Sequence, residues 1–328
     1  MKVVSLVSCI LLSILVILSL STAVQATEYR EVKAEDILKQ IENGDDVDLR
    51  DCHIVGELNV SKIKLETASN PNFDNLYRDG FINEILSFMG VKENVSVIKS
   101  TIMISNSTFE NDLDFSNVLF NNDSYFSRTT FNNSADFHGT TFNNSATFNG
   151  ANFNNYAYFY GANLNYANFV RTTFNNSATF NGANFNNDAN FYGATFNNYT
   201  DFLTANFNNN AYFSEVTFNN DSSFSGATFK HTADFRGADS NNFVNFYGAK
   251  FNNGAYFYGA NFNNYTDFSE VTFNNPADFS APDTSATIIT NDVTTCELFR
   301  SYYKSKYRLV DAGNILINYR NEVRTEKN

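Results

Sequence analysis

Tyrosines, carboxylates and an amide recur at one spacing in the second half of the chain, and they are the residues best placed to do chemistry. One series has members 22 positions apart, namely Asn190, Tyr212, Asp234, Tyr256 and Asp278. Tyrosine rings stack on sugar rings, and carboxylates accept hydrogen bonds from hydroxyl groups or bind cations. If one turn of the fold has the length of this spacing, the series is a candidate ligand face for a sugar or a cation. A solvated sheet face that binds nothing is the alternative.

Residues for other kinds of chemistry are scattered. None of the three histidines, His53, His138 and His231, stands at ligand spacing from a cysteine or another histidine, so we predict no metal site. The glycines occur singly, unlike the loops that bind phosphates or dinucleotides, so we predict no cofactor. Ser240 has no histidine or lysine base beside it in the repeat. We therefore predict no catalytic residue and no enzymatic activity.

Phenylalanine defines the elements that would position these residues. From Phe109 onward Phe recurs at alternating intervals of six and five, which gives a unit of eleven residues. A small or β-branched residue, such as Ala135 or Val216, stands two positions before nearly every Phe. This alternation predicts short strands with one buried face, and the Asn-Asn or Gly between them suits tight turns. A right-handed coiled coil also has an eleven-residue period, but it needs apolar residues three and four positions apart.

Such a unit is too short to fold alone. Burying one Phe stabilises by about 1.5–3 kcal/mol, whereas ordering five residues costs roughly 1–2 kcal/mol each in backbone entropy. Stacked coils solve the problem, because each Phe then packs on the Phe above and below it. The sequence therefore predicts an all-β solenoid.

The units at 151–155 (Ala-Asn-Phe-Asn-Asn) and 162–166 (Ala-Asn-Leu-Asn-Tyr) resemble pentapeptide repeats. The resemblance covers residues 105–280 and implies a right-handed quadrilateral β-helix with four repeats per coil. Alternate units carry an extra residue in the Asn-Asn turn, which predicts a Phe-rich variant with coils of about 22 residues, hence about eight coils and a rod of roughly 35–40 Å. One turn residue is missing between Phe159 and Phe174, and Ser240 replaces a Phe, so we expect a local irregularity at each place.

The flanking segments divide the chain into four parts. Residues 1–26 have the layout of a signal peptide, with Lys2, an apolar run and the sequence Val-Gln-Ala before the cleavage site; an uncleaved membrane anchor is the alternative. Residues 27–104 are predicted to form a helical cap, with a helix at 34–43, and irregular first coils with a loop insertion around 66–80. The β-helix follows at 105–280, and residues 281–328 are predicted to form a helical tail.

The tail is similar to the helical segment that follows pentapeptide repeats in larger membrane-associated archaeal proteins. Its predicted helical residues include Leu298, Phe299, Tyr302, Tyr303, Ile315, Leu316 and Tyr319. Cys52 and Cys296 lie in opposite flanks of the repeat, so two unlinked thiols are favoured over a disulfide.

Asn-x-Ser/Thr sequons are frequent, and in an exported protein they are candidate glycosylation sites. An Asn-rich turn followed by Ser or Thr also creates them by chance. The candidates are Asn59, Asn94, Asn106, Asn122, Asn132, Asn143, Asn175, Asn198, Asn220 and Asn264.

The net charge and the predicted export limit the functions that the chain could have. The net charge of -13 argues against binding to nucleic acid or to anionic lipid. We expect a secreted or cell-surface scaffold or binding rod, whose partner is a protein or a cell-envelope polysaccharide and whose only contact with a membrane would be an uncleaved signal segment. Two alternatives remain open: an acidic DNA-mimic inhibitor of a topoisomerase, which the resemblance implies and export opposes, and a polysaccharide-active enzyme on the solenoid face.

Overall fold

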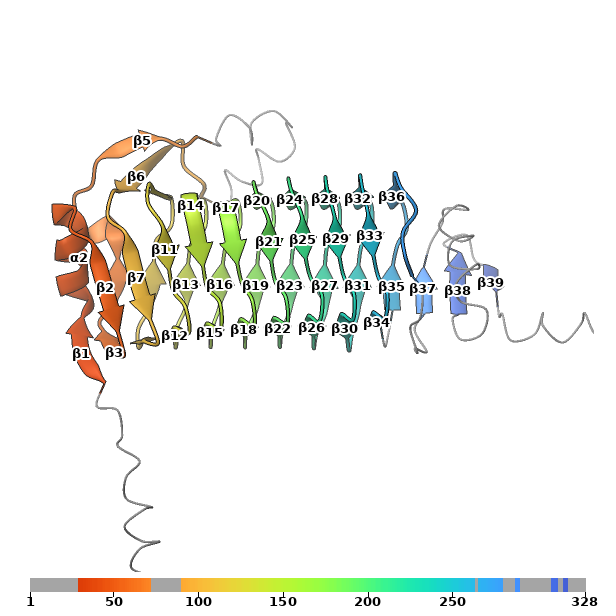
Figure 1. Cartoon of the computed structure of the whole chain (residues 1–328), viewed down its shortest axis with the longest axis horizontal. Coiled ribbons are helices and arrows are strands. Elements are labelled where there is room, and N and C mark those ends of the chain that lie inside the picture. Colours follow the sequence, from red (N-terminus) through yellow and green to blue (C-terminus); the bar gives the residue numbers. More distant parts are fainter. Residues whose placement is uncertain are drawn as a thin grey trace, which may run out of the picture.

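The chain folds as a straight rod of stacked coils (Figure 1). The computed structural model describes residues 29–71, 90–262 and 265–279, and three further strands at 287–289, 308–311 and 315–317. Within these residues the rod has about ten coils of about 22 residues, nearly all strand, with a single α-helix. The prediction of a right-handed quadrilateral β-helix is confirmed. There are more coils than expected because the segment before the repeat adds coils of its own.

Each coil contributes one short strand to each of four faces, which we number 1 to 4 in the order that the chain visits them. Neighbouring coils pair in parallel along every face. Faces 3 and 4 belong to one sheet, because β14 and β17 run through the corner between them.

The bounds of the strands are given face by face. Face 1 contains β1 (Arg30–Lys33), β3 (Cys52–Val55), β8 (Thr108–Phe109), β12 (Thr130–Phe131), β15 (Asn152–Phe153), β18 (Thr173–Phe174), β22 (Thr195–Phe196), β26 (Thr217–Phe218), β30 (Asp239–Ser240) and β34 (Asn261–Phe262). Face 2 contains β4 (Leu58–Asn59), β9 (Leu113–Asp114), β13 (Ala135–Asp136), β16 (Ala157–Tyr158), β19 (Ala178–Thr179), β23 (Thr200–Asp201), β27 (Ser222–Ser223), β31 (Val244–Asn245) and β35 (Tyr265–Asp267).

The other two faces share two strands. Face 3 contains β6 (Asn94–Ile98), β10 (Val118–Phe120), β14 (Thr141–Thr147), β17 (Asn163–Asn168), β20 (Asn184–Phe185), β24 (Asn206–Phe207), β28 (Thr228–Phe229), β32 (Lys250–Phe251) and β36 (Thr272–Phe273). Face 4 contains β2 (Val47–Arg50), β7 (Ile102–Ser105), β11 (Ser124–Tyr125), the second halves of β14 and β17, β21 (Ala189–Asn190), β25 (Ala211–Tyr212), β29 (Ala233–Asp234) and β33 (Ala255–Tyr256).

Inward phenylalanine rings fill the core in continuous stacks. Phe213 lies between Phe191 and Phe235, with ring centroids 4.9 Å apart on each side and planes within 4° of parallel. The same ring meets Phe202 and Phe224 edge to face, at 88°. Both geometries are those that aromatic pairs prefer. The residue two positions before each ring, often an alanine, is also buried and packs in the core beside the ring.

Asparagine side chains form a second ladder on the outside of one corner. Along Asn154, Asn175, Asn197 and Asn219 each amide nitrogen donates to the side-chain oxygen of the coil before it, at 2.7–2.9 Å. Each of these hydrogen bonds satisfies one donor and one acceptor, which explains why Asn is frequent in the turns.

The two predicted irregularities have different outcomes. The missing turn residue is confirmed, because the register between β14 and β17 shifts between Phe142 and Ser145. Ser240 instead pairs in register with Phe218 before it and Phe262 after it, so the predicted kink is wrong. Its buried hydroxyl donates to the Asn242 carbonyl at 3.0 Å, and only the ring stack is interrupted.

The N-terminal end has the expected helical cap. Helix α2 (Ala34–Asn43) has the predicted bounds and ends at Gly44, whose φ is 79°. β2, β3 and β4 form a first coil that pairs with β7, β8 and β9. The 3-10 turn η1 (Val60–Lys62) follows, and the predicted loop insertion contains a short strand, β5 (Thr67–Ser69), which pairs antiparallel with β6.

The C-terminal tail differs from the prediction. Its described residues form β37 (Thr287–Ile289), β38 (Arg308–Asp311) and β39 (Ile315–Ile317), which extend face 2. The helix predicted at Ile315 and Leu316 is therefore wrong: the last coil leaves an unpaired strand edge, and short segments rich in Ile, Leu and Val satisfy it. The remaining residues predicted to be helical, and Cys296, lie outside the described residues.

One corner position requires a left-handed backbone. Glycine occupies it in most coils, but Thr204 occupies it with a φ of 54°. Left-handed backbone is unfavourable for any residue with a Cβ, and most of all for a β-branched one.

Replacing Thr204 with Gly should therefore raise the free energy of unfolding by about 1 kcal/mol, because the left-handed strain disappears. Thr217→Gly, in β26 with ordinary strand backbone, is the control and should lower stability by a similar amount. Denaturant midpoints followed by circular dichroism measure both changes. A loss of stability in Thr204→Gly would show that the corner stores no strain.

Candidate ligand-binding face

The predicted ligand series lies in one column on face 4. Asn190 pairs with Tyr212, Tyr212 with Asp234, Asp234 with Tyr256, and Tyr256 with Asp278 through an isolated bridge. The five residues therefore occupy five successive coils, as the 22-residue spacing requires. Whether they bind a ligand stays a prediction.

Two polar side chains of this column already have partners within the rod. Asp234 is only 3% exposed, and its carboxylate accepts two hydrogen bonds from the Arg236 guanidinium, at 2.8 and 2.7 Å. This pairing raises the pKa of Arg236. The Asn190 side-chain oxygen accepts from the Tyr192 N–H at 3.0 Å. Of the five residues, Tyr256 presents the most surface to a ligand, with 41% of its area exposed.

The sequon asparagines are bound into the rod in the same way. In eight of them the amide nitrogen, to which a glycan would be attached, donates a hydrogen bond: Asn59, Asn106, Asn122, Asn132, Asn143, Asn175, Asn198 and Asn220. Asn94 is exposed at the start of β6 and donates no side-chain hydrogen bond to another described residue. Asn264 lies outside the described residues.

We expect Asn94 to carry a glycan. Asn175 and Asn198, which both lie in the turn between faces 1 and 2, should not carry one. A glycan on a ladder nitrogen would have to fit between coils only about 4.8 Å apart. Mass spectrometry of glycopeptides from protein isolated from its own cells measures the occupancy. Occupied ladder sites beside an unmodified Asn94 would contradict this reasoning.

A denser group of exposed aromatic side chains lies on face 2, where the sequence singled out no site. Because Ala157 and Phe159 point inward, Tyr156, Tyr158 and Tyr160 all point outward from one coil. The rings of Tyr156 and Tyr158 lie 5.8 Å apart and nearly parallel.

Face 2 has three outward columns, which we name leading, middle and trailing in chain direction. The leading column is Tyr156, Ser177, Tyr199, Asp221, Phe243 and Tyr265. The middle column is Tyr158, Thr179, Asp201, Ser223, Asn245 and Asp267. The trailing column is Tyr160, Asn181, Leu203, Ser225, Tyr247 and Ser269.

Large side chains occupy alternate coils from Tyr156 to Phe243 in the leading column and from Tyr160 to Tyr247 in the trailing column. In the leading column Tyr156, Tyr199 and Phe243 are separated by Ser177 and Asp221. The trailing column repeats the pattern with Tyr160, Leu203 and Tyr247. Two coils correspond to a spacing of roughly 9.6 Å along the rod. Between residues 156 and 247 face 2 therefore carries bulky side chains with a period twice that of the backbone, and beyond this stretch Tyr265 follows Phe243, and His138 precedes Tyr160, in adjacent coils.

Two of these tyrosines have hydrogen-bond partners in the following coil. The Tyr199 hydroxyl hydrogen-bonds with the Ser223 side chain, and the Tyr247 hydroxyl with Glu270. Tyr199 and Tyr247 remain 41% and 43% exposed.

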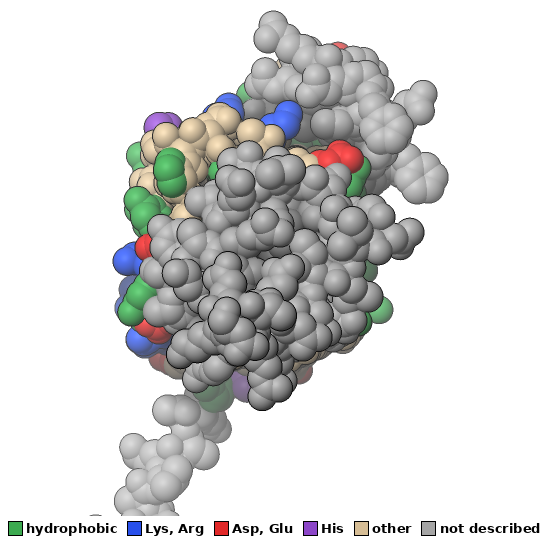
Figure 2. Space-filling view, turned by 90° about the vertical axis from the view of Figure 1, so that its right-hand side faces the viewer, with side chains coloured by type: hydrophobic (Ala, Val, Ile, Leu, Met, Phe, Trp, Pro, Cys, Tyr) green, Lys and Arg blue, Asp and Glu red, His purple; other side chains and the backbone are tan. Residues whose placement is uncertain are grey.

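The electrostatics of face 2 are acidic. The segment that forms face 2 is residues 110–118 in one coil, and equivalent segments follow in the seven later coils. These eight segments contain neither Lys nor Arg. They contain the acidic residues Asp112, Asp114, Asp136, Asp201, Asp221 and Asp267. Burial raises the pKa of the Asp201 carboxyl, and the hydrogen bond from the Leu203 N–H, at 2.9 Å, lowers it by less. Burial, and secondarily the Asp136 carboxylate, raises the pKa of Tyr160 to about 12. In the view along the rod in Figure 2, Lys/Arg and Asp/Glu side chains lie beside one another at the left-hand edge of the molecule.

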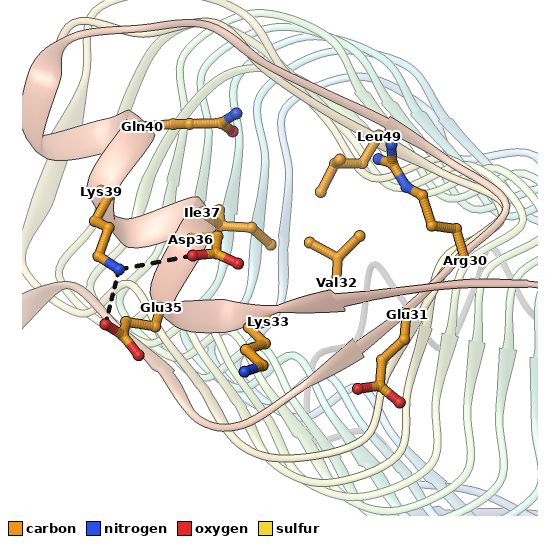
Figure 3. Close-up of a pocket in the computed structure, with 10 residues that line it drawn as sticks. All are labelled: Arg30, Glu31, Val32, Lys33, Glu35, Asp36, Ile37, Lys39, Gln40 and Leu49. Atoms are coloured by element: carbon orange, nitrogen blue, oxygen red, sulfur yellow. Dashed lines mark ion pairs between the residues drawn. The ribbon is translucent and has the colours of Figure 1, made fainter.

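The N-terminal end of the rod has a shallow pocket (Figure 3). Its apolar part is formed by Val32, Ile37 and Leu49, which close the core beneath α2. Among the charged residues around it, Lys39 pairs with Glu35 at 2.8 Å and with Asp36 at 3.7 Å. The pocket is therefore part of the helical cap at the N-terminal end of the solenoid.

The described residues contain no group of three His, Cys, Asp or Glu side chains that could hold a metal ion. Cys52 is buried, and its thiol donates to the Arg50 carbonyl at 3.0 Å. In the part of the chain that the structure describes, no helix is both long and apolar enough to cross a membrane.

Four overlapping segments, at 126–173, 159–204, 202–242 and 240–281, match the family model described as pentapeptide repeats (9 copies). This part of the rod is similar to pentapeptide repeats. No curated protein and no solved structure matches the chain. The inward residues account for the fold, and the outward residues have to account for the function.

Proposed function

We propose that this chain is an exported, non-catalytic rod that binds a cell-envelope polymer or a protein partner through its outer surface. The observation that carries the proposal is the row of exposed aromatic side chains on face 2. Large exposed apolar groups bordered by polar residues mark interaction sites on soluble proteins. Tyr156, Tyr199 and Tyr265, each more than 40% exposed, stand in one column of that face.

The backbone supports a binding role because it holds these rings in place before a ligand arrives. Each coil is hydrogen-bonded to the coils on both sides, for example from Ala178 N to Tyr199 O at 3.1 Å and from Thr200 N to Asp221 O at 3.1 Å. A preorganised surface loses little conformational entropy on binding.

The two alternatives have weaker support. A DNA mimic needs rows of carboxylates at phosphate-like spacing, but in the leading column of face 2 the single carboxylate, Asp221, lies between Tyr199 and Phe243. An enzyme that cleaves polysaccharides needs available carboxylates, whereas Asp234 is held by Arg236. Export rests on the signal-peptide layout of residues 1–26, which lie outside the described residues.

Fractionation of the cells that make the protein tests the proposal. We expect an antibody against the chain to find it in the envelope or the medium, shortened by about 26 residues, and we expect the purified protein to sediment with isolated envelopes. A full-length chain found only in the cytoplasm would refute the proposal and favour the DNA mimic.

A further inference from the structure

We infer that face 2 binds an extended, neutral, β-linked glycan that lies along the rod, with one disaccharide for every two coils. The inference rests on the proposed function and specifies the chemical class of its ligand. The leading column supplies the stacking rings, and the middle column supplies hydrogen-bonding groups.

The first argument is the period. Tyr156, Tyr199 and Phe243 recur every two coils, or roughly 9.6 Å. In an extended β-linked chain successive sugars are turned over, so the same ring face reappears once per disaccharide. A polymer with a fixed axial repeat can therefore place equivalent sugars on all three rings.

The second argument is the polar strip beside the rings. Thr179, Asp201 and Ser223 follow Tyr158 on successive coils of the middle column, so a strip of polar side chains runs beside the rings. Burial raises the pKa of Asp201, as expected for a carboxylate deprived of water. The partly exposed Asp201 carboxylate can accept hydrogen bonds from a ligand that brings many hydroxyl groups, and the neighbouring Ser223 hydroxyl can both donate and accept.

The third argument separates a glycan from a proline-rich peptide. A polyproline helix repeats every three residues, or roughly 9.3 Å, and would also match two coils. Proline has no N–H, however, so such a peptide offers few donors to Asp201 and Asp267 in the middle column. Sugar hydroxyls supply those donors, which favours the glycan.

The fourth argument is charge. The face-2 segments contain acidic residues and neither Lys nor Arg, so an anionic polysaccharide would be repelled. The ligand that fits is therefore a neutral glycan.

Calorimetric titration of the full-length protein with chitohexaose and with cellohexaose, both neutral β-linked hexasaccharides, tests the inference. We expect at least one of them to bind, the matching disaccharide to bind at least about tenfold more weakly because it covers one ring instead of three, and polygalacturonate not to bind. Tyr199→Ala should weaken hexasaccharide binding about tenfold.

Tyr29→Ala is the matched control, because this tyrosine is similarly exposed, at 39%, but lies just before β1 at the N-terminal end of the rod. It should change the affinity less than about twofold, within the range of a group outside the interface. Circular dichroism establishes that both variants keep the β-helix.

Three results would overturn the inference: no binding of either hexasaccharide, equal losses in the two variants, or binding of a basic polyproline peptide in place of the sugars. If the protein still sediments with envelopes in any of these cases, the proposed function stands and only the ligand class is wrong. If it neither reaches nor binds envelopes, the proposed function fails independently.

Discussion

Stacking of phenylalanine rings between coils is the interaction on which the rest of the molecule depends. Most inward rings meet their counterparts one coil away face to face, and many meet rings of neighbouring columns edge to face. For Phe213 the face-to-face centroid distance is 4.9 Å on both sides. This contact fixes the coil spacing, and the coil spacing sets the backbone pairing and the asparagine ladders at the corners. One coil buries too little apolar surface to offset its own ordering, so stability has to come from the contacts between coils.

The same constraint organises the outer surface. Because every coil has nearly the same length, outward residues of successive coils fall into straight columns, and changes at outward positions leave the core untouched. Face 4 uses this freedom for internal pairing, as between Asp234 and Arg236. Face 2 uses it to display Tyr156, Tyr199 and Tyr265 to solvent. The repeat therefore separates the residues that fold the rod from those that give it a function.

Much of the fold could be predicted from the sequence because it depends on local, repeated signals. The Phe spacing determines the coil length, Gly44 marks the end of α2, and the shortened interval after Phe159 locates the shift in register between β14 and β17. The strands of the tail could not be predicted in the same way. Ile315–Ile317 has no repeat signal, and it becomes a strand through antiparallel pairing with β38.

The candidate site was harder to predict than the fold. A search at the position before each Phe finds the column of Tyr212 and Tyr256, and the structure confirms that they share a face. That position does not include Tyr156, which lies three residues before Phe159, or Tyr160, which follows it. The large residues in these two columns recur only every second coil between residues 156 and 247. A period of 43 or 44 residues, as from Tyr156 to Tyr199 and on to Phe243, is the signal that would have found them. That Asp234 is held by Arg236 depends on side-chain conformation, which the spacing of the residues does not determine.

The central claim is that inward rings hold the rod together and outward rings do not. Comparing the unfolding of Phe213→Ala with that of Phe243→Ala tests it most directly, because the two residues are chemically identical and differ in the side of the coil they occupy. Phe213 is fully buried, whereas Phe243 is part of the outer leading column. Phe213→Ala should lower the free energy of unfolding by about 3–5 kcal/mol, and Phe243→Ala by less than about 1 kcal/mol. Similar small losses in both variants would contradict the account.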